Sequence, residues 1–165
     1  MKMALLIIDL QKAYYNDKTK ESMASACEYI NAIIPFFRKK NLPIVWVQQK
    51  DEEDGAIPGQ PGFEFIDQLK PEQQDYRITK EYGNGFNKTN CFDIIKKNGI
   101  DTIVITGFCA EYCVLSTYRG AQDLDLSPVI LKNAISSDNK EHIKMVEEIS
   151  NVISYGILSK VINAI

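Results

Sequence analysis

The chain has 165 residues, of which 45% are hydrophobic and 25% charged, values typical of a globular protein that forms one domain over 1–165. Its net charge is −3 and it has no long basic cluster, so we expect no binding to nucleic acid or to a membrane. The N-terminal apolar run is too short for a secretory signal, and no stretch reaches transmembrane length. We therefore expect a cytoplasmic protein with free cysteines.

Short apolar runs alternate with longer amphipathic ones, a pattern typical of βαβ units. Strands are predicted at 4–8, 44–48, 77–79, 102–106, 128–131 and, from a weaker pattern, 151–154. Helices are predicted at 22–40, 91–97, 112–124, 139–149 and from 156 to the end. The predicted fold class is therefore α/β, a three-layer α/β/α sandwich with a doubly wound, Rossmann-like parallel sheet of about six strands.

The segment 51–71 is the longest irregular stretch, acidic at first and then rich in proline and glycine. Long loops in compact domains often serve a site, but a plain surface excursion is an equal alternative. In doubly wound sheets, ligands bind outside the carboxyl ends of the strands, where the strand order reverses. Functional residues are therefore sought at the ends of the predicted strands.

Two charged residues follow predicted strands directly. Asp9 comes after a wholly apolar strand, where a carboxylate is costly unless it is paired or functional. Lys80 follows the strand at 77–79. It becomes a candidate functional residue only because it shares the same edge of the sheet with Asp9. No glycine-rich phosphate-binding motif follows a strand, so nucleotide binding is not expected.

Cys113 is the candidate nucleophile. It falls in the first turn of the helix at 112–124, where unpaired N–H groups and the helix dipole should lower a thiol pKa of about 8.5. His142, the single histidine, lies at the polar start of a later helix and is expected at the surface. A cysteine nucleophile would then depend on Asp9 for proton transfer, with the pKa of Asp9 raised by burial.

The remaining cysteines have other predicted roles. Cys27 lies on the apolar face of a helix and Cys91 begins one, so both are read as structural. Cys109 lies in the turn before Cys113, and a reactive or redox role, including a disulfide with Cys113, stays open. One histidine and no Cys-x-x-Cys pair make a metal site improbable.

Four segments in order resemble the isochorismatase-like hydrolase superfamily, which includes nicotinamidases and N-carbamoylsarcosine amidohydrolases. The first is Leu-Leu-Ile-Ile-Asp-Leu-Gln at 5–11, and the second is Ile-Thr-Lys at 78–80 with Gly-Phe-Asn-Lys-Thr at 85–89. The third is Ile-Asp-Thr-Ile-Val-Ile-Thr-Gly-Phe at 100–108 with Tyr-Cys-Val-Leu-Ser-Thr at 112–117. The fourth is Pro-Val-Ile-Leu-Lys-Asn-Ala-Ile-Ser-Ser at 128–137. Each is weak alone, but together they span nearly the whole chain.

The resemblance implies a catalytic triad of Asp9, Lys80 and Cys113. In that scheme Cys113 attacks a carbonyl or amide carbon, Asp9 takes and returns the proton, and Lys80 stabilises the charges. It also implies a cis peptide bond between Phe108 and Cys109, with the backbone N–H groups of Cys109 and Cys113 as the oxyanion hole. A homo-oligomer, a dimer or higher, is implied as well, although the apolar C-terminal tail could equally pack on its own sheet.

Departures from the family pattern narrow the prediction. Nicotinamidases carry an Asp-x-His pair and further histidines after the second strand to hold a metal, whereas 46–51 contains no histidine. We therefore expect no metal and no cofactor, and a small-molecule substrate with an amide, carbamoyl or related carbonyl group in place of nicotinamide. The usual Ala-Thr-Asp is replaced by Cys109-Ala110-Glu111. The residues expected to line the substrate pocket, each with core packing or rim surface as its alternative, are Gln48, Tyr14, Phe86 and Tyr112.

Two other interpretations remain. A non-catalytic or redox-sensing relative would keep the pocket and use Cys113 or Cys109 as a sensor without hydrolysing any amide. A receiver or flavodoxin-like module would share the layers, but a receiver needs a phosphoacceptor aspartate after the third strand, where this chain has Lys80.

Overall fold

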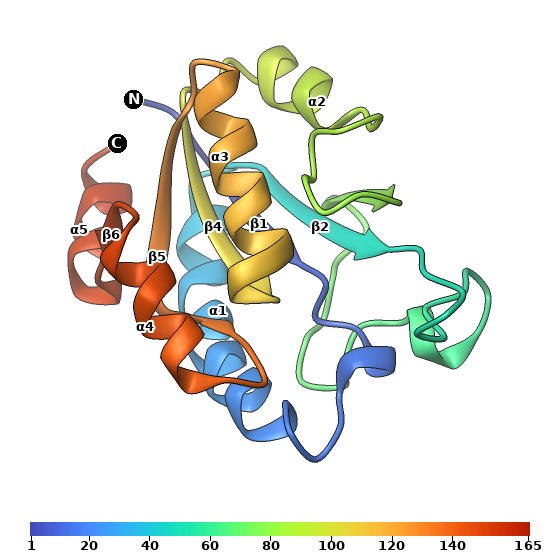
Figure 1. Ribbon diagram of the computed structural model, residues 1–165. Coiled ribbons are helices and arrows are strands. Elements are labelled where there is room, and N and C mark those ends of the chain that lie inside the picture. The colour runs from blue at the N-terminus through green and yellow to red at the C-terminus, as the bar shows by residue number, and fades with distance from the viewer.

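Six parallel strands form one sheet between two layers of helices in the computed structural model, which describes residues 1–165 (Figure 1). The strands are β1 (Met3–Ile8), β2 (Ile44–Gln49), β3 (Tyr76–Lys80), β4 (Thr102–Phe108), β5 (Ser127–Ser136) and β6 (Val152–Ile153). Their order in the sheet is β3-β2-β1-β4-β5-β6, with every neighbouring pair parallel. The predicted fold class is confirmed.

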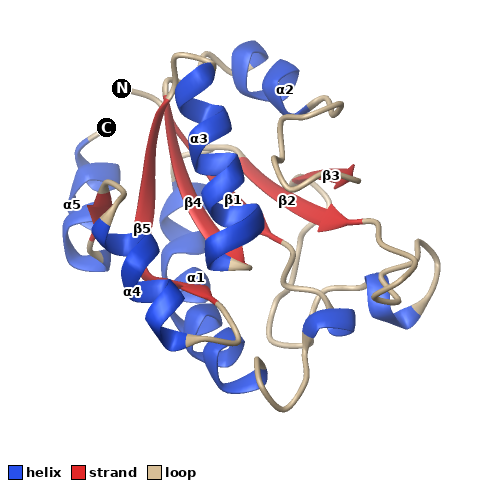
Figure 2. Ribbon diagram, in the orientation of Figure 1, coloured by secondary structure: helices blue, strands red, loops and turns tan.

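Helices cover both faces of the sheet (Figure 2). They are α1 (Lys20–Lys39), α2 (Cys91–Lys97), α3 (Leu115–Asp123), α4 (Lys140–Glu148) and α5 (Tyr155–Ala164), with short 3-10 turns η1 (Lys12–Tyr14) and η2 (Pro61–Phe63). Phe37 of α1 and Leu158 of α5 are buried in the core on one face. Ile95 of α2, Tyr118 of α3 and Val146 of α4 are buried in the core on the other.

The central strand β1 shows why this sequence gives a covered sheet. Successive side chains of a strand point to opposite faces, and every residue of β1 is buried. Leu5 and Ile7 pack in the α1 and α5 core, whereas Leu6 and Ile8 pack in the core under α2, α3 and α4. An uninterrupted apolar run is what two covered faces require.

Most elements lie within about two residues of their predicted bounds, and two differ more. The strand predicted at 128–131 continues to Ser136 because Ile135 and Ser136 resume pairing with β4 after an irregularity in register. Polar residues at 132–133 hide this continuation in the sequence. The helix predicted at 112–124 begins with a π-helical turn, η3 (Ala110–Val114), in which the Val114 N–H donates to the Cys109 carbonyl.

The apolar C-terminal tail packs on its own sheet, one of the two roles left open above. Leu158 and Ile162 are buried in the core on the α1 face, whereas Ile157 and Ile165 are exposed. Oligomerisation stays a prediction. None of the helices is both long enough and apolar enough to cross a bilayer.

The strand order reverses between β1 and β4, and this pair defines the crevice where ligands bind in such sheets. Gly107 of β4 pairs with Ile8 of β1 at the carboxyl end of the pair. Its φ is 118°, a conformation that side chains rarely adopt, and an added Cβ would lie 2.1 Å from the Ile8 carbonyl oxygen. Glycine at this position therefore lets the two strand ends approach closely.

Gly107→Ala should lower the free energy of unfolding by about 3 kcal/mol or more, because the new Cβ meets rigid backbone and φ is unfavourable. Urea denaturation measures the change. Gly156→Ala is the matched control, since a Cβ there has nothing within 4 Å and lies in α5. We expect the control to change stability by no more than about 1 kcal/mol. Equal effects of the two substitutions would contradict the close approach of β1 and β4.

Candidate active site

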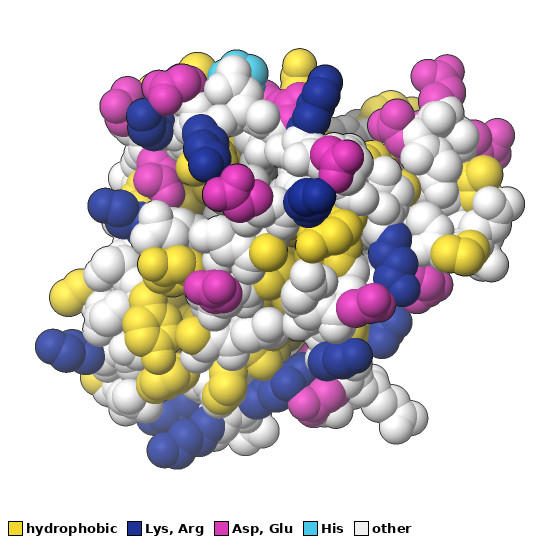
Figure 3. Space-filling view, turned by 90° about the horizontal axis from the view of Figure 1, so that it is seen from below, with side chains coloured by type: hydrophobic (Ala, Val, Ile, Leu, Met, Phe, Trp, Pro, Cys, Tyr) yellow, Lys and Arg dark blue, Asp and Glu magenta, His cyan; other side chains and the backbone are white.

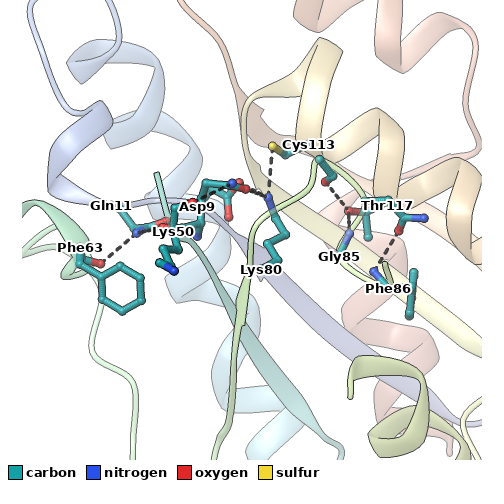
Figure 4. A network of polar contacts seen from close by, with 12 residues as sticks. Asp9, Gln11, Lys50, Phe63, Lys80, Gly85, Phe86, Cys113 and Thr117 are labelled. Carbon is teal, nitrogen blue, oxygen red and sulfur yellow. Dashed lines mark hydrogen bonds and ion pairs between the residues drawn. The ribbon is translucent and has the colours of Figure 1, made fainter. Parts of the chain in front are cut away.

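The ammonium group of Lys80 connects the parts of the site (Figure 4). Its Nζ donates to Asp9 Oδ2 at 2.8 Å, to Gln49 Oε1, and to Cys113 Sγ at 3.3 Å. An ammonium group has three N–H donors, so each is matched to one acceptor. Almost none of the Lys80 and Asp9 side chains is exposed, 0% and 1%. The structure thus brings together the three residues of the predicted triad and adds Gln49.

Strand geometry places these side chains. Lys80 is the last residue of β3, not the residue after it, and is paired in register with Gln49 of β2. Ile78 and Val47, two residues earlier in each strand, pack in the core under α3, so alternation directs Lys80 and Gln49 to that same face. Asp9 follows β1 with a φ of 51°, and its N–H donates to the Val47 carbonyl at 2.9 Å.

Gln48, predicted to line the pocket, does not do so. Strand alternation turns it to the opposite face of β2, where its Nε2 donates to the Phe63 carbonyl at 2.8 Å. Gln11, which no sequence pattern singled out, is fully buried. Gln11 accepts a hydrogen bond from the Gln49 N–H at 2.7 Å and donates to the carbonyls of Gln49 and Phe63. Counting in steps of two along β2 would have selected Gln49, because it shares a face with Val45 and Val47.

Phe86 was also expected to line the pocket. It belongs instead to the core under α3 and is not part of the cavity wall. The turn at 83–86 is held to α3 by Thr117, whose Oγ1 accepts from the Gly85 N–H at 2.9 Å (Figure 4). Gly83, in the same turn, does reach the cavity wall. The aromatic ring therefore anchors the turn without contacting the cavity.

A cavity of about 470 Å³ opens at the carboxyl ends of β1 and β4, with Asp9 and Cys113 in its wall. Tyr14 and Tyr112 also line it, as predicted, and Tyr14 stacks on Phe108 with the ring centroids 5.5 Å apart. The start of the segment 51–71 contributes two carboxylates to the wall, so this part of the segment serves the site. Its later part packs on the core.

The Cys113 thiol does not have the lowered pKa that the sequence predicts. Burial and the neighbouring Asp9 carboxylate raise the pKa of Cys113 to about 12, and Lys80 opposes them only in part. Burial of the thiol and the adjacent Asp9 carboxylate outweigh any effect of the helix dipole. Burial also raises the pKa of Asp9, as predicted, although Lys80 acts the other way. Cys113 therefore keeps its proton at neutral pH, and Asp9 Oδ1 is buried in the same wall without a hydrogen-bond partner.

The loop before Cys113 has the form that the resemblance implies. The Phe108–Cys109 peptide bond is cis. The Cys109 N–H donates no hydrogen bond to any backbone or side-chain acceptor. It is therefore available to a ligand atom in the cavity, whose wall includes Cys109.

Glu111 fixes the thiol of Cys109. Its Oε2 accepts from the Cys109 Sγ–H at 3.0 Å, while its Oε1 accepts from the Ser137 hydroxyl at 3.1 Å. Burial and the Glu111 carboxylate raise the pKa of Cys109, so this thiol stays protonated. Burial would raise the pKa of Glu111 as well, but hydrogen bonds from Cys109, His142 and Ser137 keep it below its usual value.

His142 is partly exposed, as predicted, but it is not a free surface group. Its Nδ1 lies 2.6 Å from Glu111 Oε1. Glu111, Asp138 and His142 are also the one group of three possible metal ligands, with ligand atoms within 4.8 Å of one another. Glu111 and His142 are already hydrogen-bonded to each other. Their proximity is therefore explained by this contact and does not require a metal ion.

Comparison with known proteins defines the class. The isochorismatase domain model matches residues 3–154. The uncharacterized isochorismatase family protein YrdC of Bacillus subtilis is 30% identical over 139 residues, which cover 82% of this chain and 74% of YrdC. The chain therefore belongs to the isochorismatase family of hydrolases, which includes amidohydrolases.

Two solved structures resemble this one over nearly their whole length. An isochorismatase-like hydrolase from Alkaliphilus metalliredigens has a TM-score of 0.88 and 23% identity, covering 98% of this chain and 99% of that one. The N-carbamoylsarcosine amidase from Thermoplasma acidophilum has a TM-score of 0.83 and 25% identity, covering 94% and 97%. The sandwich fold is thus shared with both proteins.

Asp9→Asn should speed alkylation of Cys113 by iodoacetamide at pH 8, because loss of the carboxylate lowers the thiol pKa. Lys80→Met should slow alkylation, because loss of the ammonium raises that pKa. We expect changes of about threefold or more in each direction, located by peptide fragmentation mass spectrometry. Lys50→Met, which removes an exposed lysine paired with Glu81, is the control and should change nothing. Slower labelling in Asp9→Asn would contradict the placement of the charges.

Glu111→Gln should lower the free energy of unfolding by about 1–3 kcal/mol at pH 7, because a charged acceptor of several hydrogen bonds is lost. The folded-state pKa of Glu111 is lowered, so its charge stabilises the native state above the unfolded-state pKa. The difference from wild type should therefore shrink as the pH falls from 6 toward 3. Glu141→Gln, an exposed residue of α4 paired with Lys144, should cost less than about 0.5 kcal/mol. A difference that grows on acidification would exclude this account.

Proposed function

We propose that the protein is a metal-independent cysteine amidohydrolase acting on a small amide, carbamoyl or related carbonyl compound. One observation carries the proposal: a fully buried ammonium, Lys80, donates to both Asp9 and Cys113 at the wall of a cavity large enough for a small molecule. A nucleophile, a base and a cation thus meet where a ligand can bind. Membership of a hydrolase family with amidohydrolase relatives supports the same conclusion.

The first step forms a tetrahedral intermediate, which becomes a thioester when the leaving group departs. Cys113 Sγ attacks the carbonyl carbon while its proton passes to Asp9 Oδ1, the free carboxylate oxygen. The carbonyl oxygen becomes an oxyanion, held by the backbone N–H groups of Cys109 and Cys113. Each such donor contributes about 3 kcal/mol to transition-state stabilisation in well-studied hydrolases. Lys80 keeps Asp9 ionised before transfer and offsets the charge that develops on sulfur.

The second step releases the products. Protonated Asp9 gives its proton to the leaving nitrogen, the C–N bond breaks, and the amine or ammonia departs. Asp9 then takes a proton from a water molecule that attacks the thioester, and the C–S bond breaks to give the carboxylic or carbamic acid. The Cys113 thiol is restored when Asp9 returns this proton, so no other reactant is needed.

Asp9 is assigned as the base because it shares Lys80 with Cys113 and its Oδ1 has no partner, whereas the single histidine is occupied. His142 is bonded to Glu111 and does not line the cavity. The raised pKa of Asp9 makes it a stronger base than an ordinary carboxylate, which suits proton transfer from a thiol. The segment between β2 and β3 contains no histidine, so the reaction is proposed to proceed without a metal.

Cys113→Ser should lower kcat/KM by about a thousandfold or more, whereas Cys109→Ser should keep activity within about tenfold. The reason is that Cys113 is the nucleophile, while Cys109 contributes its backbone and donates its thiol proton to Glu111. The assay is ammonia release from small primary amides and N-carbamoyl amines, including N-carbamoylsarcosine, with and without EDTA. EDTA should leave the rate unchanged.

Equal losses in Cys113→Ser and Cys109→Ser would contradict the assignment of the nucleophile. The alternative, a redox-sensing protein, makes the opposite set of predictions. It requires that peroxide join Cys109 to Cys113 in a disulfide while no amide in the panel is hydrolysed. The distinction is made by non-reducing peptide mass spectrometry beside the ammonia assay.

A further inference from the structure

The cavity beside Cys113 is acidic. Three carboxylates in its wall, those of Asp51, Asp54 and Asp138, form no ion pair in the structure. Lys18 is the one ammonium in the wall. The Asp9 carboxylate is balanced by Lys80, so it adds no net charge. Three anions therefore face one cation across the space that a substrate would fill.

The carboxylates approach the crevice from two sides. Asp51 and Asp54 follow β2, whereas Asp138 follows β5. Because β2 and β5 flank the central pair β1 and β4, these groups lie on either side of the crevice. Figure 3 views the molecule from below, and acidic side chains gather at the upper right of that view with no lysine or arginine among them.

The fold keeps these carboxylates available. Asp51 Oδ1 accepts from the N–H groups of Glu53 and Asp54, which fixes the turn and leaves its second oxygen without a protein partner. The polar contact of the Asp138 carboxylate is a long one, 3.4 Å from Oδ1 to the Ser137 hydroxyl, which lies closer to Glu111. Burial raises the pKa of Tyr14 in the cavity wall, and the nearby carboxylates of Asp9, Asp51 and Asp54 raise it further, as a negative potential there would. Asp9 Oδ1 is buried without a partner in the same wall. It lies at the end of the cavity where the scissile carbonyl would bind.

We propose that this cavity selects substrates that carry a positively charged group, an ammonium or a guanidinium, away from the scissile carbonyl. The inference rests on the proposed function, because it places the carbonyl at Cys113 and the cation toward Asp51, Asp54 and Asp138. A substrate carboxylate in that position would meet three unpaired anions, so anionic amides are disfavoured. Asp51, Asp54 and Asp138 are thus specificity-determining residues.

The first test measures the charge of the cavity without a substrate. Two thiol reagents of similar size, 2-aminoethyl methanethiosulfonate (a cation) and 2-sulfonatoethyl methanethiosulfonate (an anion), are reacted with Cys113 in the native protein. Each rate is divided by the rate of the same reagent with 2-mercaptoethanol. We expect the corrected cation-to-anion ratio to exceed unity by about tenfold or more at low salt, and to fall at 0.5 M NaCl.

Charge-neutral variants identify the residues responsible. Asp51→Asn, Asp54→Asn and Asp138→Asn should each lower the ratio by about twofold or more, and asparagine can keep the turn contacts of Asp51. Asp123→Asn, an exposed residue of α3 outside the cavity, removes the same charge and should leave the ratio unchanged. If Cys113 reacts too slowly, the ratio is read at Tyr112→Cys, which places a thiol in the same wall. A corrected ratio at or below unity, or one unchanged in all three variants, overturns the inference.

A second test uses matched amides: β-alaninamide (cationic), butanamide (neutral) and succinamate (anionic). The inference predicts that kcat/KM falls in that order by about tenfold per step. Hydrolysis with succinamate preferred would leave the proposed function standing and refute the charge selection. A reagent ratio that favours the cation, with none of the panel amides hydrolysed, would instead support the charge selection and count against the amidohydrolase function.

Discussion

The buried ammonium of Lys80 is the interaction on which the rest of the site depends. Removing an ammonium from water is costly, and the cost is met only when charge and hydrogen bonds are both satisfied. Lys80 reaches Asp9 at the end of β1, Gln49 at the end of β2 and Cys113 in η3. β2 lies between β3 and β1 in the sheet, so the lysine side chain extends across the end of one strand to reach the next. One cation thereby fixes the relative positions of three chain segments far apart in sequence.

The chemistry follows from how that cation is shared. Gln49 is a neutral acceptor, so Asp9 alone balances the charge of Lys80, and the thiol of Cys113 remains protonated. In the reaction proposed above, the site therefore stores no reactive thiolate. The proton leaves sulfur only when a carbonyl carbon is in place and a carboxylate oxygen can accept that proton.

Neighbouring segments hold the residues around Lys80 in position and add charge to the cavity wall. Gln11 fixes the backbone of Gln49 through two hydrogen bonds and donates a third to the Phe63 carbonyl, and Thr117 holds the turn that carries Gly83. Glu111 accepts from the thiol of Cys109 and so holds the loop that contributes Cys109 to the cavity wall. The segments after β2 and β5 add carboxylates at the mouth. The sheet supplies the rigid reacting centre, while the loops on either side set the charge that a ligand meets.

The sequence by itself determined the layered fold and the positions of Asp9, Lys80 and Cys113. Apolar runs of strand length, alternating with amphipathic helices, leave little choice of architecture, and polar residues at strand ends must meet at one edge. Only the tertiary structure decided that Gln49 and not Gln48 faces the site, that Phe86 is core, and that the pKa of Cys113 is raised. The same holds for the bond between His142 and Glu111. Periodicity records which residues are apolar, whereas partner choice, burial and local charge depend on segments brought together by folding.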